Sequence, residues 1–312
     1  MQNGNLTNAT RLKEYLDKEA HRHVNTDSDS ELLLNILANE LQKTGKVRIN
    51  EEDFFNAVSG VFDQCVGGYA CAGMIAGSFE ILICKLIAQC SGYGLFAFRD
   101  RHGIRPLVYG LRKTSYGYDY MVASESVALN ALGFEQHVDI LPGEAVLFKR
   151  DGFIKRQVVP AAEFTPCIFE YVYFSRPDSI IDGVSVYKAR LAMGEALAKK
   201  ILLLFGNNHG IDVVVPVSCS PLVHKSTNLI DKQVPDTSRV AALEASQKLC
   251  IPYREGFIKN RYIGRTFIMP GQKQRRKNVR RKLNAMSMEF QGKNVLIVDG
   301  TYSFFHLGLS LL

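Results

Sequence analysis

Two short apolar runs in the second half of the chain restrict its fold. They are residues 211–217 (IDVVVPV) and 294–298 (NVLIV), and both are rich in β-branched side chains. Uninterrupted runs of this kind are typical of parallel strands that are buried on both faces. Helical patterns lie at residues 187–205 and 240–249. Because alternating helices and buried strands form a parallel sheet covered by helices, we predict an α/β domain in this half. In the longer helix, the residues expected on the apolar side are Leu191, Leu197, Ile201 and Leu204.

The first half of the chain is rich in predicted strands. They cover residues 69–76, 94–98, 120–123 and 145–148. A helix is predicted after Ser28, because Ser28 and Glu31 have the S-x-x-E spacing of a capping box. Its buried face should carry Leu32, Leu33, Ile36, Leu37 and Leu41, which repeat at helical spacing. The change in pattern between the halves places a domain boundary near residues 160–170, and we divide the chain into residues 1–164 and 165–312.

Length, cysteine content and charge limit the class of protein. The 312 residues are enough for two ordinary domains. The seven cysteines are scattered without a CxxC pair, which makes a disulfide framework improbable and favours a reducing, cytoplasmic location. No sequence segment is apolar enough for a membrane helix, and the N-terminus lacks the pattern of a secretory signal. The net charge of +7 is concentrated in residues 259–282, which hold ten Lys and Arg residues and no acidic ones.

This basic segment indicates an anionic partner at one place rather than over the whole surface. A solvated charged face, a site for a small phosphorylated ligand and a nucleic-acid patch all remain open from composition. Tyr262 and Phe267 stand apart, and no known nucleic-acid module surrounds them. Asp299 ends an apolar run, where an acidic residue can bind ribose hydroxyls or a divalent cation or can simply form a turn. Residues 235–238 could likewise be only the N-cap of the next helix.

Several long strings resemble the amidophosphoribosyltransferase family, in its fungal or bacterial form without an iron–sulfur cluster. In the first half they are NGNLTN (3–8), NTDSDSELLLNIL (25–37), FRDRHGIRPLVYG (98–110) and ASES (123–126). In the second half they are FEYVYFSRPDSIIDGVSVYKARLAMG (169–194), PDTSRVAALE (235–244) and residues 252–284, which begin PYREGFIKNRYIGRTFIMPGQ. The resemblance covers nearly the whole chain apart from two internal stretches and the last dozen residues.

The resemblance implies a mixed α/β fold with two functions. Residues 1–164 would be a type 2 glutamine amidotransferase domain, an N-terminal-nucleophile hydrolase sandwich that lacks its N-terminal part. Residues 165–312 would be the first half of a type I phosphoribosyltransferase domain. Such an enzyme hydrolyses glutamine and passes the ammonia to phosphoribosyl pyrophosphate, giving 5-phosphoribosylamine, glutamate and pyrophosphate in the first committed step of purine biosynthesis. The resemblance also implies a homo-oligomer without a membrane.

The resemblance assigns roles to particular residues. Asn3 and Gly4 match the oxyanion hole of the glutaminase, and Asp29 matches the residue that holds the α-amino group of glutamine. Ser238 and Asp299 match ligands of Mg²⁺ and substrate. The flap that closes over pyrophosphate is matched by Lys259, Arg261, Tyr262 and Arg265. Cys167 aligns with an iron–sulfur position of some relatives, but the other ligands are not found, so no cluster is expected.

Four departures from the family pattern lead us to expect an inactive chain. The earliest cysteine, Cys65, cannot supply both a thiolate and a free α-amine, so the nucleophile is expected to be absent. Asp299 is followed by Gly300 instead of a second carboxylate and a phosphate-binding loop, and residues 300–312 form an aberrant tail. Insertions lie at about residues 78–92 and 217–233, and their sequences are consistent with translated introns.

Two alternatives to an enzyme follow from these departures. The chain could be a non-catalytic partner of an intact copy, which co-purification would reveal. It could instead bind nucleic acid through residues 259–282, which strongly salt-dependent binding would reveal.

Overall fold

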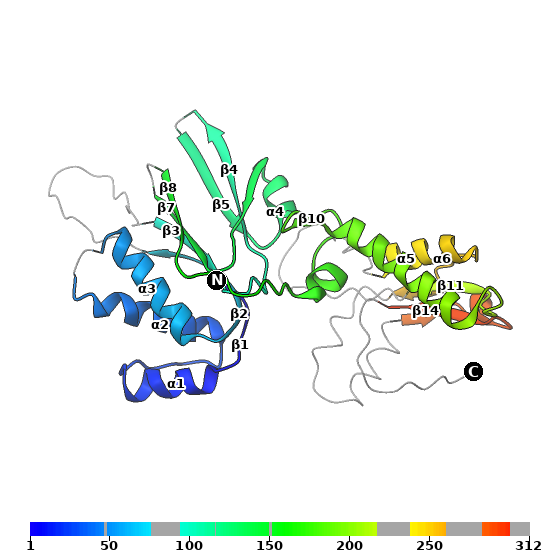
Figure 1. Cartoon of the computed structure of the whole chain (residues 1–312), viewed down its shortest axis with the longest axis horizontal. Helices are drawn as coiled ribbons and strands as arrows, with labels where there is room; N and C mark the ends of the chain where they lie inside the picture. The colour runs from blue at the N-terminus through cyan, green and yellow to red at the C-terminus, as the bar shows by residue number, and fades with distance from the viewer. Residues whose placement is uncertain are drawn as a thin grey trace. The chain divides into compact units, whose positions relative to one another are not determined.

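The computed structural model describes residues 1–46, 49–75, 94–115, 117–149, 152–216, 238–259 and 283–299. The chain divides into two compact units, Met1–Cys167 and Ile168–Leu312 (Figure 1). The predictions about residues 78–92, 217–233 and 300–312 lie outside the described residues, as do those about Arg261, Tyr262 and Arg265.

A five-stranded antiparallel sheet forms the centre of the first unit. Its order is β1 (Gln2–Leu6), β2 (Gly67–Ile75), β3 (Gly94–Arg99), β7 (Glu144–Lys149) and β8 (Gly152–Gln157). The last pair between β2 and β3 is Ile75 with Gly94, so the strands on either side of the first insertion are direct partners. The two strands are therefore antiparallel neighbours on either side of the undescribed segment.

A second, three-stranded sheet packs against one face of the first. Its order is β5 (Gly117–Ala123), β4 (Val108–Thr114) and β6 (Gln136–Asp139), and the short helix α4 (Ser126–Asn130) follows β5. The core between the two sheets contains Ala70, Ala97, Leu107, Tyr109, Ile140, Val146 and Phe148. The first unit is therefore a sandwich of two sheets.

Three helices cover the other face of the five-stranded sheet (Figure 1). They are α1 (Ala9–Lys18), α2 (Asp29–Lys43) and α3 (Glu51–Gln64). The core beneath them includes Leu33, Ile36, Leu37, Phe54, Val58, Phe96 and Phe98. Four of the five residues predicted for the buried face of α2 are buried, and Leu41 is half-buried. The capping box of this unit joins Asn50 and Asp53 at the start of α3.

The capping box predicted at Ser28 and Glu31 is correct for Ser28 and wrong for Glu31. Ser28 does cap α2, since its hydroxyl accepts a hydrogen bond from Ser30 N at 3.3 Å. Glu31 does not reach back to Ser28. Its carboxylate accepts from Asn25 N and Thr26 N, at 2.8 Å each, and from the Thr26 hydroxyl. These hydrogen bonds, the Thr26 hydroxyl first, lower the pKa of Glu31 to about 2.

The second unit contains a pair of parallel strands, as the sequence predicted. β11 (Val213–Pro216) lies beside β14 (Val295–Val298) in parallel register, with Pro216 opposite Val298. All four residues of β11 are buried. The prediction that β14 is buried on both faces is wrong, because Ile297 is 53% exposed. An apolar run identifies the strand but not the elements that cover it.

Two helices, α5 (Val186–Phe205) and α6 (Arg239–Leu249), pack against each other. The face that α5 buries consists of Val186, Arg190, Gly194, Ala198 and Ile201. The predicted apolar side is therefore partly wrong, since Leu204 is 62% exposed. Close approach explains the difference: a Cβ added at Gly194 would lie 2.3 Å from Ala241 O in α6.

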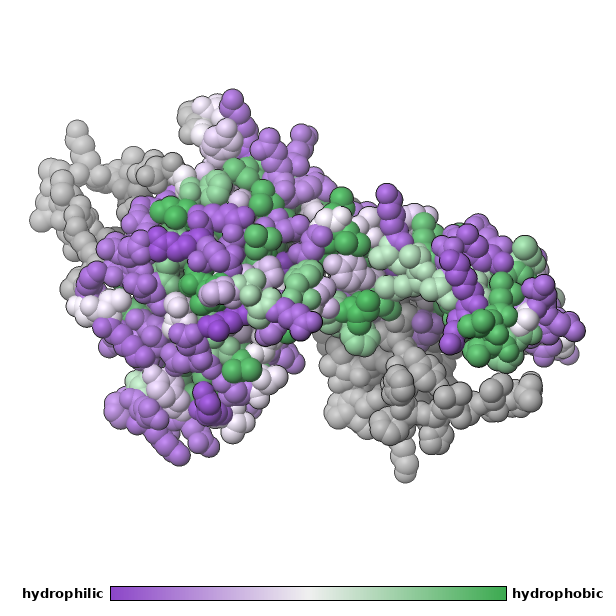
Figure 2. All heavy atoms as spheres, in the orientation of Figure 1, coloured by the Kyte–Doolittle hydropathy of each residue, from purple (hydrophilic) through white to green (hydrophobic). Residues whose placement is uncertain are grey.

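Short elements complete the described part of the second unit. They are a helical turn at Glu170–Phe174, β9 (Ile180–Ile181), β10 (Val184–Ser185), β12 (Phe257–Lys259), β13 (Leu283–Ala285) and α8 (Ser287–Phe290). Hydrophobic residues gather on the visible surface of this unit in Figure 2. At the end of α5, the exposed ones are Leu203, Leu204 and Phe205. Within the described ranges, no helix combines the length and apolar character that crossing a membrane requires.

Candidate functional site

Strand β1 carries two of the predicted site residues, Asn3 and Gly4. Within the described residues it lies at one edge of the five-stranded sheet and pairs only with β2. Asn3 lies opposite Ala70, and Gly4 lies opposite Tyr69. The backbone groups on the outer side of β1 are therefore available for contacts beyond the sheet.

The hydrogen bonds at the ends of β1 show which residues face that outer side. Met1 exchanges both backbone hydrogen bonds with β2, and Thr7 N donates to the residue that precedes β2. Because backbone groups alternate in direction along a strand, even-numbered residues point toward the open edge. Leu6 agrees with this alternation, since its N–H donates to Asp29 Oδ2 at 2.8 Å. The N–H of Gly4 therefore also lies on the open edge.

Gly4 cannot be replaced by a larger residue without distortion. Its φ of 123° lies in a region that side chains rarely allow. A Cβ at this position would lie 2.0 Å from the carbonyl oxygen of Gly68 in the neighbouring strand. The backbone of β1 approaches β2 closely at the point where the Gly4 N–H faces outward.

Asn3 is held by a residue that lies far away in the sequence. Arg105 Nη2 donates to Asn3 Oδ1 at 2.7 Å. The guanidinium has only donors, so it can bind only the oxygen of the amide, and the amide nitrogen must point elsewhere.

Arg105 ends a loop that two buried charged residues organise. Arg99 is 1% exposed, and its guanidinium donates to the carbonyl oxygens of Arg105, Gly103 and Ile140 at 2.7, 2.8 and 3.0 Å. Asp100, also 1% exposed, accepts from the backbone N–H groups of three residues. These donors are His102 at 2.8 Å, Ile104 at 3.0 Å and Tyr69 at 3.2 Å. The loop is thereby fixed to β2.

Asp29 is brought to the same edge as Gly4. It is the first residue of α2, where the positive end of the helix dipole favours a carboxylate. Its Oδ2 accepts from Leu6 N, two residues after Gly4 in β1. Within the described part of the chain, no group donates to Oδ1. The structure therefore brings together the three residues predicted for glutamine.

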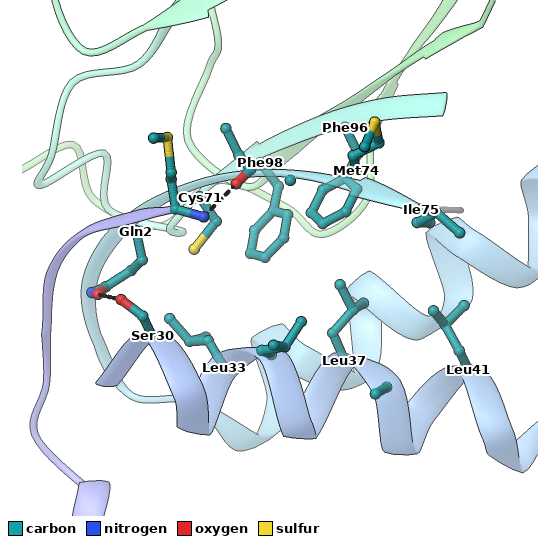
Figure 3. Close-up of a pocket in the computed structure, with 15 residues that line it drawn as sticks. Gln2, Ser30, Leu33, Leu37, Leu41, Cys71, Met74, Ile75, Phe96 and Phe98 are labelled. Carbon is teal, nitrogen blue, oxygen red and sulfur yellow. Dashed lines mark hydrogen bonds between the residues drawn. The ribbon is translucent and has the colours of Figure 1, made fainter. Parts of the chain in front are cut away.

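A small apolar cavity lies on the α2 side of the sheet (Figure 3). Its volume is about 240 Å³, and its walls include Leu33, Leu37, Leu41, Cys71, Ile75, Phe96 and Phe98. At one end, the Ser30 hydroxyl donates to Gln2 Oε1 at 3.0 Å. Because neighbouring side chains of a strand alternate in direction, the side chain of Gln2 and the cavity lie on the opposite face from Asn3.

The two cysteines near this region are poor candidates for a nucleophile. Burial raises the pKa of the Cys65 thiol to about 12, and burial also raises the pKa of Cys71. Since the thiolate is the reactive form, both thiols are inert at neutral pH. Neither Cys65 nor Cys71 is therefore suited to nucleophilic attack in its buried position.

In the second unit, the described residues include two of the predicted metal ligands, Asp299 and Ser238. Asp299 directly follows β14 at the carboxyl end of the pair and is exposed. Ser238 is 1% exposed and precedes α6, but its hydroxyl does not cap the helix. Ser238 thus occupies the N-cap position of α6 without a side-chain capping hydrogen bond, and residues 235–237 lie outside the described residues. Lys259 ends β12, and Arg261, Tyr262 and Arg265 lie outside the described residues.

The oxygen atoms of Ser238 and Asp299 are suitable ligands for a hard cation. A hydroxyl and a carboxylate offer oxygen atoms, which Mg²⁺ prefers, and Mg²⁺ commonly completes its shell with substrate phosphates and water. In the described ranges, no three His, Cys, Asp or Glu side chains gather as a metal cluster. Ser238 and Asp299 are the predicted ligands that fall among the described residues.

Sequence reasoning did not identify Arg105 as part of the first site. The residue lies inside the string FRDRHGIRPLVYG, but its partner Asn3 is 102 positions away. No local pattern predicts such a contact. Two adjacent charged residues, Arg99 and Asp100, at the end of a predicted strand could have indicated that the loop after them is ordered.

Comparisons with known proteins identify relatives of both units. Residues 1–131 match the family model of the glutamine amidotransferase domain. The chain is 52% identical over 298 residues to amidophosphoribosyltransferase of Pseudomonas aeruginosa, covering 95% of this chain and 53% of the relative. It is 52% identical over 311 residues to amidophosphoribosyltransferase of Schizosaccharomyces pombe, covering 95% and 52%. The chain thus spans about half the length of these relatives.

A solved structure supports the same relationship. The glutamine phosphoribosylpyrophosphate amidotransferase of B. subtilis, complexed with ADP and GMP, matches with a TM-score of 0.66 and 30% identity. The match covers 96% of this chain and 55% of that structure. The predicted mixed α/β fold, with an N-terminal-nucleophile hydrolase sandwich in the first unit, is confirmed by this match.

Proposed function

Because the chain belongs to the amidophosphoribosyltransferase family, of whose length it spans about half, we propose that it carries parts of both substrate sites of that reaction. The reaction converts glutamine, phosphoribosyl pyrophosphate and water into 5-phosphoribosylamine, glutamate and pyrophosphate. Residues 1–164 would bind glutamine, and residues 165–312 would bind phosphoribosyl pyrophosphate. We further propose a cytoplasmic homo-oligomer without an iron–sulfur cluster.

The glutamine site would be built on the open edge of β1. The Nδ2 of Asn3 and the N–H of Gly4 are the donors for the oxygen of the tetrahedral intermediate. Donors of this kind act on charge that develops in the transition state, and removal of one typically costs about 10²–10³ in rate. The carboxylate of Asp29 binds the α-ammonium group of glutamine.

One observation carries this proposal. Asp29 accepts a hydrogen bond from the outward N–H of Leu6, so its carboxylate lies against the same strand edge that presents Gly4 N. A glutamine molecule needs a carboxylate for its ammonium at one end and donors for its amide oxygen at the other. The edge of β1 supplies both.

The phosphoribosyl site would lie beyond the carboxyl ends of β11 and β14, where open α/β sheets bind ligands. Asp299 and Ser238 are the residues that would hold Mg²⁺, which would neutralise charge on pyrophosphate as it leaves. The cations of Lys259, Arg261 and Arg265, together with the hydroxyl of Tyr262, would bind the pyrophosphate oxygens. Exclusion of water by these residues would protect the activated sugar from hydrolysis.

Glutamine binding tests the first site. Calorimetric titration of the chain with L-glutamine should show binding that Asp29→Asn weakens at least about ten-fold, because hydrogen bonds to charged groups contribute ~1.5–3 kcal/mol. The matched control is Asp27→Asn, since Asp27 is exposed and pairs with Lys13 instead. Equal affinities in the two variants would contradict the role of Asp29.

Binding of phosphoribosyl pyrophosphate tests the second site. Affinity should rise when Mg²⁺ is added, and Asp299→Asn should remove that increase. Asp178→Asn is the control, because Asp178 lies in the same unit but pairs with Arg176. An affinity of the unaltered chain that does not respond to Mg²⁺ would contradict the proposed ligands.

A further inference from the structure

The guanidinium of Arg105 contacts one of the two proposed oxyanion donors directly. It is the group that holds the side-chain amide of Asn3, through the 2.7 Å hydrogen bond to Oδ1. The two ends of an asparagine amide are nearly equal in size but opposite in hydrogen-bonding character. An amide turned by 180° would present its oxygen, an acceptor, to the oxyanion and would repel it.

We propose that Arg105 is a positioning residue that fixes the Asn3 amide with Nδ2 facing the oxygen of bound glutamine. This inference rests on the proposed function of the first unit. Arg105 acts through Asn3 and need not touch glutamine itself. Because a guanidinium has no acceptor, the turned amide would place two donors against each other.

The position of Arg105 is itself well defined. Arg99 Nε holds the carbonyl oxygen of Arg105, and Asp100 holds the loop that precedes it. Ile104 packs closely on Gly68, because a Cβ at Gly68 would lie 2.6 Å from the Ile104 side chain. The arginine therefore projects from a fixed backbone toward β1.

The positive charge has a second effect on the amide. A hydrogen bond from a charged donor is stronger than one between neutral groups. A hydrogen bond accepted at Oδ1 also polarises the amide and strengthens donation from Nδ2. Arg105 would thus both orient Asn3 and make it a better donor to a negative oxygen.

The orientation can be measured without catalysis. In ¹⁵N-labelled full chain, the side-chain NH₂ signals of Asn3 are assigned by their loss in Asn3→Asp. Arg105→Met keeps the length of the side chain but removes the donors. In this variant we expect the chemical shifts of the two Nδ2 protons to move toward those of a free amide, because the hydrogen bond at Oδ1 no longer polarises the amide. Arg105→Lys keeps a cationic donor and should restore the shifts in part.

Arg101→Met is the matched control. Arg101 lies in the same loop, but its guanidinium pairs with Asp63 at 2.6 Å. Its replacement should leave the Asn3 signals unchanged. If Arg105→Met folds with dispersed backbone signals and leaves the two Nδ2 proton shifts of Asn3 unchanged, the positioning role is overturned. If all variants lose the Asn3 signals alike, a general loss of structure is the cause, and the proposal is also overturned.

Glutamine added to the same samples separates this proposal from the proposed function. Oxyanion donors act on charge that develops in the transition state, so Arg105→Met should change the affinity for glutamine by less than about three-fold. If glutamine fails to bind even the unaltered chain while Arg105 still controls the Asn3 amide, the proposed function fails and the positioning role stands. If glutamine binds the unaltered chain but Arg105→Met leaves the Asn3 amide unchanged, the glutamine site stands and the role of Arg105 is overturned.

Discussion

At the scale of single residues, Gly4 is the position in β1 where the backbone leaves no space for a side chain. We expect Gly4→Ala to destabilise the first unit by about 1–3 kcal/mol, because strained φ values alone cost that much and Gly68 O blocks the new Cβ. Urea unfolding measures the change. Gly45→Ala is the control, since Gly45 has a φ of 66° but no atom within 4 Å of the added Cβ. Equal losses in both variants would mean that strain, and not the close approach, sets the cost.

Glu31 makes the stability of the first unit depend on acid. Its folded pKa of about 2 lies below the ordinary value of 4.5, mainly because of the Thr26 hydroxyl. A lowered pKa gives stability that is present above pH 4.5 and is lost as the pH falls toward 2. Glu31→Gln should therefore be less stable than the unaltered chain at pH 7, and the difference should shrink between pH 4.5 and 2. Urea midpoints across this range measure it, with Glu14→Gln as the control. A constant difference would contradict the assignment.

Single residues also show the limit of sequence patterns. The S-x-x-E spacing correctly placed Ser28 at the start of α2 but assigned Glu31 the wrong partner, because the preceding residues Asn25 and Thr26 offer four donors. Asn3, Gly4 and Asp29 could be named in advance only through long strings shared with a family. Arg105 could not, because its contact depends on how two sheets bring distant segments together.

At the scale of elements, the contact between α5 and α6 depends on one glycine. Gly194→Ala should destabilise the second unit by about 1–3 kcal/mol, since the new methyl group would meet Ala241 O at 2.3 Å and push the helices apart. Thermal unfolding measures this loss. Gly60→Ala in α3 is the control, because its Cβ would meet only the flexible side chain of Glu40. An unaltered midpoint for Gly194→Ala would show that the helices can separate at little cost.

The positions of helices and strands were easier to predict than the faces that they bury. The β-branched run at 211–217 identified β11, and helical spacing identified α5 and α6 to within a few residues. The buried face of α5 was predicted only in part, because Gly194 and Arg190 lie there while Leu204 is exposed. The spacing of apolar residues does not reveal that a helix can pack most closely at a glycine, such as Gly194.

At the scale of the whole molecule, each hydrophobic cluster found among the described residues draws its members from one unit. The clusters around Phe54, Val146 and Leu129 belong to Met1–Cys167, and those around Ala198, Tyr171 and Val214 belong to Ile168–Leu312. We therefore expect two unfolding transitions in calorimetry. Gly4→Ala should lower only one midpoint, and Gly194→Ala should lower only the other. A single transition that both variants shift would show that the units unfold together.

The long separation between Asn3 and Arg105 has a consequence during protein synthesis. Ribosomes add about 5–20 residues per second, so the roughly one hundred residues between the two take about 5–20 s to appear. Ile140, whose carbonyl oxygen anchors Arg99, emerges later still. Asn3 therefore receives its contact with Arg105 only after the whole segment between the two residues has been made.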